Sequence, residues 1–184
     1  KGILTFGGAF SNHIAATAAA GLALNIPTVG VIRGEELASK IELNSTLKYA
    51  KSCGMHLEYV LRSDYKQKND PAYLKLLLEN FKNFYVIPEG GTNELAIKGC
   101  QEILSQEDLT FDIICCAVGT GGTIAGLINS SLPTQKIIGF PALKGGFLNE
   151  DIRKFASQSN WELWDAYHFG GYAKVDSKLI TFMN

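Results

Sequence analysis

The chain has 184 residues, of which 46% are hydrophobic and 19% charged, and its formal net charge is −1. These values are typical of a soluble globular protein, and without an excess of positive charge a nucleic-acid partner is not expected. The longest apolar runs, such as 113–118, are too short to span a bilayer, which argues against a membrane protein. Four cysteines without a CxxC pair, and three histidines without ligand-like spacing, predict reduced thiols in a cytoplasmic protein and no metal site.

Apolar runs typical of strands alternate with helical patterns along the whole chain. The expected strands are 3–6, 28–32, 56–61, 84–87, 112–118, 136–140 and 161–166, followed by a strand-like run at 179–184. Ser11 and Asp70 are expected to cap two of the intervening helices, and one helix is expected to carry both Ile41 and Ala50. Strands this apolar are buried on both faces, so the pattern predicts an α/β fold with parallel sheets and right-handed crossovers.

The order of these units favours two doubly wound, mostly parallel-sheet lobes. The expected division is 1–92 for a smaller lobe and 93–184 for part of a larger one, because a new series of strand–helix units begins near Gly91. The chain opens and closes on apolar, strand-like segments without flanking residues. We therefore expect a fragment that is truncated at both ends.

The sharpest local signal is the glycine-rich segment from Val118 to Gly126, VGTGGTIAG, which follows the most apolar strand. Glycines let backbone N–H groups turn toward an anion, and a helix start adds partial positive charge, so the segment predicts a phosphate site. A Walker loop is excluded by the missing GK[ST] ending, and a dinucleotide fingerprint by the misplaced third glycine. A tight strand–helix turn without a ligand is the alternative.

A second glycine turn, GGAFSNH, follows the first strand at Gly7 to His13. Taken alone, it indicates a helix cap at Ser11 and a tightly packed, alanine-rich helix beyond. Ser11 and His13 are two positions apart, so on a helix they do not face each other, and a Ser–His catalytic pair is not expected.

Together with the segment Glu89 to Asn93, EGGTN, these two turns resemble one family. In this order they are similar to the motifs of 1-aminocyclopropane-1-carboxylate deaminases and D-cysteine desulfhydrases, which are fold-type II pyridoxal-phosphate enzymes related to the tryptophan synthase β chain. The resemblance runs through essentially all 184 residues. It implies pyridoxal 5′-phosphate as cofactor, held by the larger lobe.

The resemblance also implies roles for individual residues. The cofactor phosphate would be held by Gly119, Thr120, Gly121, Gly122 and Thr123. Asn12 would bind the 3′ oxygen of the pyridine ring, Ser11 would accept a proton beside the substrate Cα, and His13 would help to bind the substrate carboxylate. Tyr172 matches a substrate-facing tyrosine of the family, with a packing role as the alternative. The lysine that binds the cofactor covalently precedes the first strand in the family and is absent, so the chain alone is expected to be inactive.

The implied activity is that of a lyase or deaminase, a hydrolase in the broad sense, acting on a small amino acid. Desulfhydrases carry a histidine at the position of His13 where deaminases usually carry glutamine, which favours β-elimination of D-cysteine to pyruvate, ammonia and sulfide. Ring opening of 1-aminocyclopropane-1-carboxylate to 2-oxobutanoate and ammonia is the alternative. A non-catalytic module that binds a phosphate ligand is a hypothesis of another class. A homodimer is the assembly that the resemblance suggests.

Overall fold

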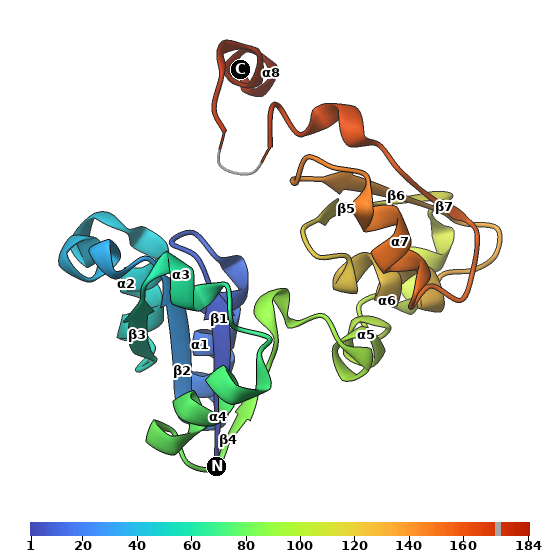
Figure 1. The fold of residues 1–184 in the computed structure, drawn as a ribbon. Helices are drawn as coiled ribbons and strands as arrows, with labels where there is room; N and C mark the ends of the chain where they lie inside the picture. The colour runs from blue at the N-terminus through green and yellow to red at the C-terminus, as the bar shows by residue number, and fades with distance from the viewer. Residues whose placement is uncertain (172–173) are drawn as a thin grey trace. The chain divides into compact units, whose positions relative to one another are not determined.

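The computed structural model describes residues 1–171 and 174–184 of the chain. The chain folds into two compact units, Lys1–Gly91 (unit 1) and Thr92–Asn184 (unit 2), which Figure 1 shows in blue to green and in yellow-green to red. Within the described ranges, no helix has the length and apolar character needed to cross a bilayer.

Unit 1 contains a four-stranded sheet in the order β3-β2-β1-β4, and every pair of neighbours is parallel. Its strands are β1 (Gly2–Gly7), β2 (Thr28–Arg33), β3 (His56–Val60) and β4 (Phe84–Val86). Its helices are α1 (Asn12–Leu24), η1 (Glu35–Leu43), α2 (Ser45–Ser52), α3 (Arg62–Tyr65), α4 (Pro71–Asn80) and η2 (Glu89–Gly91). The parallel order follows from helical crossovers between successive strands, as the apolar pattern predicts.

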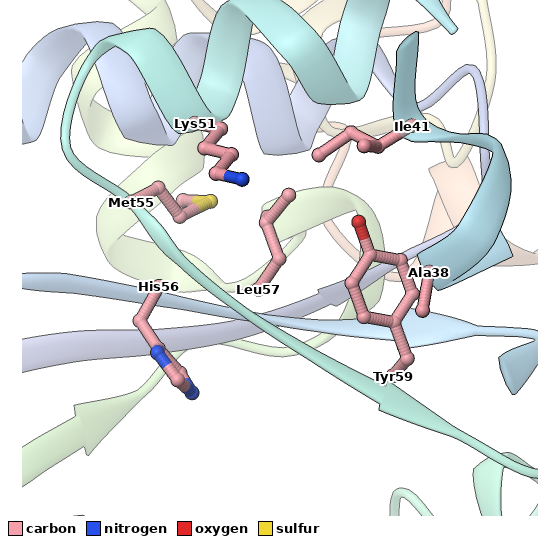
Figure 2. Close-up of a pocket in the computed structure, with 7 residues that line it drawn as sticks. All are labelled: Ala38, Ile41, Lys51, Met55, His56, Leu57 and Tyr59. Carbon is pink, nitrogen blue, oxygen red and sulfur yellow. The ribbon is translucent and has the colours of Figure 1, made fainter. Parts of the chain in front are cut away.

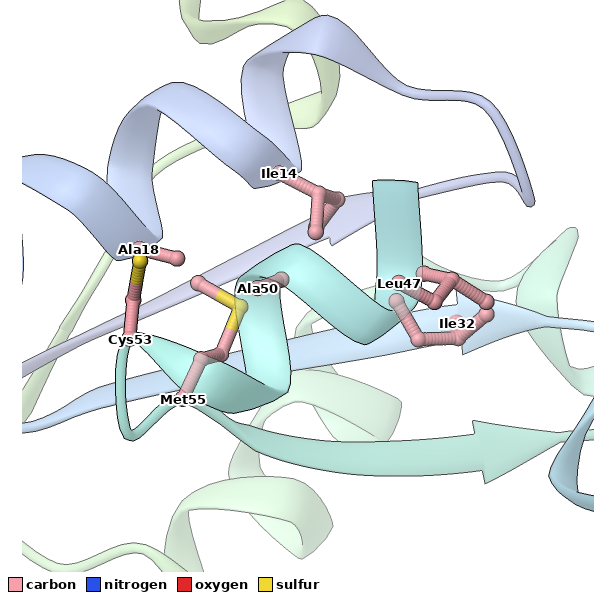
Figure 3. Packing of buried hydrophobic residues seen from close by; sticks show 7 residues of the cluster. All are labelled: Ile14, Ala18, Ile32, Leu47, Ala50, Cys53 and Met55. Atoms are coloured by element: carbon pink, nitrogen blue, oxygen red, sulfur yellow. The ribbon is translucent and has the colours of Figure 1, made fainter. Parts of the chain in front are cut away.

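Helices cover both faces of this sheet. On one face, Ile14 of α1 and Leu47 of α2 pack against Ile32 of β2 in a fully buried cluster (Figure 3). On the other face, Leu4 and Phe6 of β1 contact side chains from α3 and α4. Side chains alternate along a strand, so the residue between Leu4 and Phe6 points toward α1.

Unit 2 contains a three-stranded parallel sheet in the order β5-β6-β7. Its strands are β5 (Ile113–Val118), β6 (Lys136–Pro141) and β7 (Trp161–Leu163). Its helices are α5 (Glu94–Cys100), η3 (Gln106–Thr110), α6 (Gly122–Ser130), α7 (Phe147–Arg153), η4 (Asp165–Tyr167) and α8 (Ser177–Met183). The core lies where Ile124 of α6 and Ile152 of α7 pack against Val118 and Ile137 of the sheet.

The prediction that β5 is buried on both faces is wrong for this chain. Ile114 and Cys116 face the core, whereas Ile113, Cys115 and Ala117 are exposed. Among the described strands β5 pairs only with β6, so it is an edge strand with one covered face. An apolar sequence indicates that both faces of a strand are suited to burial. It does not indicate whether other elements of the chain pack against both faces.

Three secondary-structure predictions are also wrong in whole or in part. The expected strand 161–166 is shorter, because β7 ends at Leu163 and Asp165–Tyr167 form η4. Residues 179–183 of the expected strand-like run are helical and belong to α8, because the Asp176 side chain accepts a hydrogen bond from Leu179 N at 2.8 Å and caps the helix. The helix expected to carry both Ile41 and Ala50 is divided into η1 and α2. Asn44 divides it, since its Oδ1 accepts from Leu47 N at 2.8 Å and starts a new helix.

The packing of α5 on α6 gives a stability test. A Cβ added at Gly126 of α6 would collide with Cys100 Cβ of α5 and lie 2.8 Å from the Cys100 carbonyl carbon. A Cβ added at Gly99, which precedes Cys100 on α5, would meet nothing within 4 Å. We expect Gly126→Ala to lower the free energy of unfolding by about 1–3 kcal/mol through overpacking. Gly99→Ala should raise it by up to about 1 kcal/mol, because alanine favours the helix.

Urea unfolding followed by tryptophan fluorescence measures this difference in unit 2, because both tryptophans, Trp161 and Trp164, belong to that unit. Equal stability of the two alanine variants would show that α5 and α6 do not approach as closely as the structure places them.

Candidate functional site

The turn between β5 and α6 exposes backbone donors at the carboxyl edge of the unit 2 sheet. Gly121 is the N-cap of α6 and no side chain caps this helix. The first backbone bond at this end runs from Ala125 N to Gly121 O at 3.1 Å. The preceding helical amides, from Gly122 to Ile124, therefore have no acceptor within the helix. Free amides and the positive end of the helix dipole form a site suited to an anion.

The three glycines of this turn are present for different physical reasons. Gly121 has a φ of 89°, and a Cβ there would lie 2.8 Å from Ile152 Cγ1. A Cβ at Gly122 would lie 2.9 Å from Thr92 Oγ1. Both glycines are thus required by the fold itself. A Cβ at Gly119 would meet nothing within 4 Å, so only this glycine leaves space that the protein does not use.

Threonine hydroxyls surround the same turn. Thr120 Oγ1 lies 2.7 Å from Thr92 Oγ1, and the two hydroxyls form a hydrogen bond. Thr92 belongs to the EGGTN segment, so the end of this segment contacts the turn 119–123 within unit 2. Thr120 and Thr123 are both exposed, so their hydroxyls are accessible to a ligand.

The turn between β1 and α1 presents side chains instead of free amides. Ser11 caps α1, and its Oγ accepts from Ile14 N at 3.2 Å, as predicted. A Cβ at Gly7 would lie 2.7 Å from Ser11 Oγ, so glycine is needed there for the cap to approach the strand. Asn12 is exposed, and its side chain makes no hydrogen bond with any described residue. It is free to bind a ligand.

His13 points back from α1 onto β1. Its Nε2 lies 2.6 Å from Thr5 Oγ1, and Thr5 Oγ1 also donates to Ile87 O at 3.0 Å. Burial of the ring lowers the pKa of His13 below its usual value, and the negative charge of Glu89 opposes this effect only in part. A largely neutral imidazole is therefore expected near pH 7.

Glu89 is held at the same edge by a buried tyrosine. Tyr65 Oη donates to Glu89 Oε1 at 2.7 Å, and Lys68 Nζ lies 3.3 Å from Glu89 Oε2. Burial and the bond to Glu89 raise the pKa of Tyr65, which therefore stays protonated. The Arg33 guanidinium lies 5.7 Å from the centre of the Tyr65 ring. The sequence contained the EGG motif as a signal for Glu89, but no pattern linked it to Tyr65.

The structure thus places the predicted residues at two sheet edges. Ser11, Asn12 and His13 follow β1 in unit 1, and the turn 119–123 follows β5 in unit 2. Tyr172 lies outside the described residues. In the part of the chain that is described, no group of three or more potential metal ligands occurs.

A separate hollow of about 230 Å³ lies beside β3 and α2 of unit 1 (Figure 2). Its lining combines apolar side chains with the polar ends of several others: Ala38, Ile41, Lys51, Met55, His56, Leu57 and Tyr59. None of the predicted site residues lines it, so we do not connect it with the site.

Comparison with known proteins gives a consistent group of relatives. The chain is 34% identical over 140 residues to the bifunctional D-cysteine desulfhydrase/1-aminocyclopropane-1-carboxylate deaminase of Arabidopsis thaliana. The aligned region covers 68% of this chain and 35% of that protein. It is 29% identical over 201 residues to a Pyrococcus horikoshii protein named for 1-aminocyclopropane-1-carboxylate deaminase, covering 98% and 60% respectively. The chain therefore spans between about a third and three fifths of these relatives. No family model matches it.

Comparison with solved structures agrees with this group of relatives. The crystal structure of an ACC deaminase homologue superposes with a TM-score of 0.75 at 25% identity, covering 97% of this chain and 59% of the other. Maize serine racemase shares the fold, with a TM-score of 0.56 at 23% identity, covering 75% of this chain and 40% of the racemase.

The buried imidazole predicts how stability depends on pH. The pKa of His13 is lowered from 6.5 in the folded protein, so the unfolded chain binds a proton first as the pH falls. The free energy of unfolding should then decrease below pH 6.5, until the pH reaches the lowered pKa, with a slope of up to about 1.4 kcal/mol per pH unit.

Chemical denaturation between pH 7.5 and 5 measures this slope. In His13→Gln the slope should be smaller, because the amide does not titrate in this range. His56→Gln, at an exposed position on β3, is the matched control for the replacement of a histidine by glutamine. An unchanged slope in His13→Gln would show that the ring is not buried in its neutral form.

Proposed function

Because the chain belongs to the 1-aminocyclopropane-1-carboxylate deaminase and D-cysteine desulfhydrase family, we propose that it is part of a pyridoxal-phosphate-dependent lyase acting on a small amino acid. The observation that carries this proposal is the space at Gly119 beside the uncapped start of α6. It is the part of the turn that packing within the protein does not explain, and it suits an anion held by amides.

The residues of the turn fit a permanently bound phosphate. The backbone N–H groups at the start of α6 would donate to its oxygens, and the Thr120 and Thr123 hydroxyls are exposed beside them. No lysine or arginine lies between Gly119 and Thr123, so the anion would be held by dipoles and hydrogen bonds alone. Such a site suits an anchoring phosphate better than a phosphate that is transferred.

Pyridoxal phosphate, when bound, supplies an electron sink that stabilises negative charge at the substrate Cα. Asn12 would donate to the 3′ oxygen of the ring, since its side chain is exposed and unpaired among the described residues. Ser11 would lie beside the substrate Cα. Its oxygen accepts from Ile14 N and keeps a second lone pair for a proton, so the cap also fixes its orientation.

D-Cysteine is the substrate we propose. Elimination of sulfide and hydrolysis convert D-cysteine and water into pyruvate, hydrogen sulfide and ammonia. A histidine at position 13 and the bifunctional Arabidopsis relative support this choice. The same relative supports 1-aminocyclopropane-1-carboxylate as a second candidate substrate. We further propose that the enzyme is a cytoplasmic homodimer.

The space at Gly119 provides a test of cofactor binding. Gly119→Ala should fold normally, because its Cβ meets no protein atom within 4 Å, but the methyl group would enter the anion site. We expect the affinity for pyridoxal phosphate to fall by about tenfold, equivalent to about 1.4 kcal/mol. Gly99→Ala, equally open but on α5, should bind the cofactor normally. Titration by cofactor absorbance measures both, and equal affinities would argue against a phosphate at this turn.

The substrate is tested on the cofactor-loaded, full-length protein. We expect sulfide and pyruvate to be released from D-cysteine. Formation of 2-oxobutanoate from 1-aminocyclopropane-1-carboxylate, assayed on the same sample, distinguishes the sibling activity. Cofactor binding without either product would favour a non-catalytic phosphate-ligand module.

A further inference from the structure

The Thr5 hydroxyl determines which nitrogen of His13 carries a proton. Thr5 is fully buried on β1 and its Oγ1 contacts two groups, Ile87 O at 3.0 Å and His13 Nε2 at 2.6 Å. A hydroxyl has one proton, and a carbonyl oxygen can only accept. The proton of Thr5 is therefore directed to Ile87 O, and Nε2 must be the donor in its bond to Thr5.

The acceptor of the Thr5 proton is fixed by the sheet. Ile87 follows β4, and its N–H donates to Leu4 O of β1 at 2.8 Å. Ile87 therefore extends the ladder between β1 and β4, which also pairs Leu4 with Val86. Because the backbone sets this direction, the hydroxyl cannot turn its proton toward His13 without leaving a carbonyl unpaired.

We infer that Thr5 is a positioning residue, which holds His13 as the Nε2–H form and presents Nδ1 as an acceptor for a donor group of the substrate. This inference rests on the proposed function only for the identity of the ligand. A neutral ring with its proton on Nε2 cannot donate from Nδ1, so it cannot bind a carboxylate there. It can accept from an amino or thiol group.

Glycine at position 91 keeps a side chain away from the Nδ1 edge of His13. A Cβ at Gly91 would lie 3.0 Å from His13 Cε1 and 3.2 Å from Nδ1, so a larger residue would press on this edge of the ring. Gly91 also has a φ of 74°, which favours glycine. Within the described residues, no hydrogen bond to Nδ1 occurs.

The charges near His13 are compatible with the neutral form. Glu89 is the carboxylate that acts on the ring, and its own charge is engaged by Tyr65 and Lys68. The Arg33 guanidinium lies over the Tyr65 ring. Burial outweighs Glu89 in setting the pKa of His13, which lies below its usual value.

Nitrogen NMR of the ¹⁵N-labelled protein tests the protonation state without any substrate. The chain has three histidines, and His13→Gln identifies the signals of His13 by their loss. We expect a neutral ring protonated at Nε2, with a slowly exchanging N–H proton that persists in Thr5→Ser and disappears in Thr5→Val. A ring protonated at Nδ1, or a cationic ring at pH 7.5, overturns the inference without any Thr5 variant, so the test does not depend on the folding of Thr5→Val.

Kinetics with D-cysteine test the substrate contact. An acceptor at Nδ1 is lost on protonation, so KM should rise as the pH falls through the pKa of His13, while an imidazolium binding the carboxylate requires KM to fall. Thr5→Val should raise KM about three- to tenfold with a smaller change in kcat. Thr5→Ser keeps the hydroxyl and should have a KM close to that of the unmodified protein. A KM that falls at low pH, or that is equal in Thr5→Val and Thr5→Ser, overturns the assignment of Nδ1. Absence of turnover would refute the proposed function and leave the NMR result to decide the role of Thr5.

Discussion

The parallel direction of the strands is the constraint on which the candidate site depends. Parallel neighbours joined by helical crossovers bring all strand-to-helix turns of a sheet to one edge. In unit 1 the turns after β1 and β4 are therefore neighbours, which allows His13 to meet Thr5 and Gly91. In unit 2 the turn after β5 opens at the corresponding edge of its own sheet. Strand direction alone therefore brings residues that are distant in sequence to the same edge of a sheet.

The glycines of the turn after β5 differ in whether the fold itself requires them. At Gly121 and Gly122 a side chain would collide with Ile152 or Thr92, so conformation and packing alone require glycine. A motif rich in glycine is therefore weaker support for a ligand than its composition suggests. An anion site is supported instead by the open position, Gly119, together with the uncapped helix that follows.

The sequence predicted the α/β alternation, the parallel sheets and the cap at Ser11, because apolar periodicity and capping are local properties. It failed at Asp176, where a capping aspartate was overlooked before an apolar run, and at Cys115, whose exposure depends on which elements cover β5. It also gave no role to Thr5. The contact of Thr5 with His13 depends on strand register and on the orientation of α1, and neither is encoded in a motif.

Hydrogen bonding at the start of α1 separates the tasks of its first residues. Ser11 turns its oxygen toward the Ile14 amide, while the ring of His13 reaches back to the sheet and donates to Thr5. Positions two apart on a helix diverge, so His13 is not placed to remove the Ser11 proton. In the mechanism that we propose, a proton accepted by Ser11 from the substrate Cα must therefore leave by another route. In this proposal His13 contacts a different atom of the ligand, so that substrate binding and deprotonation depend on independent groups of the same short turn.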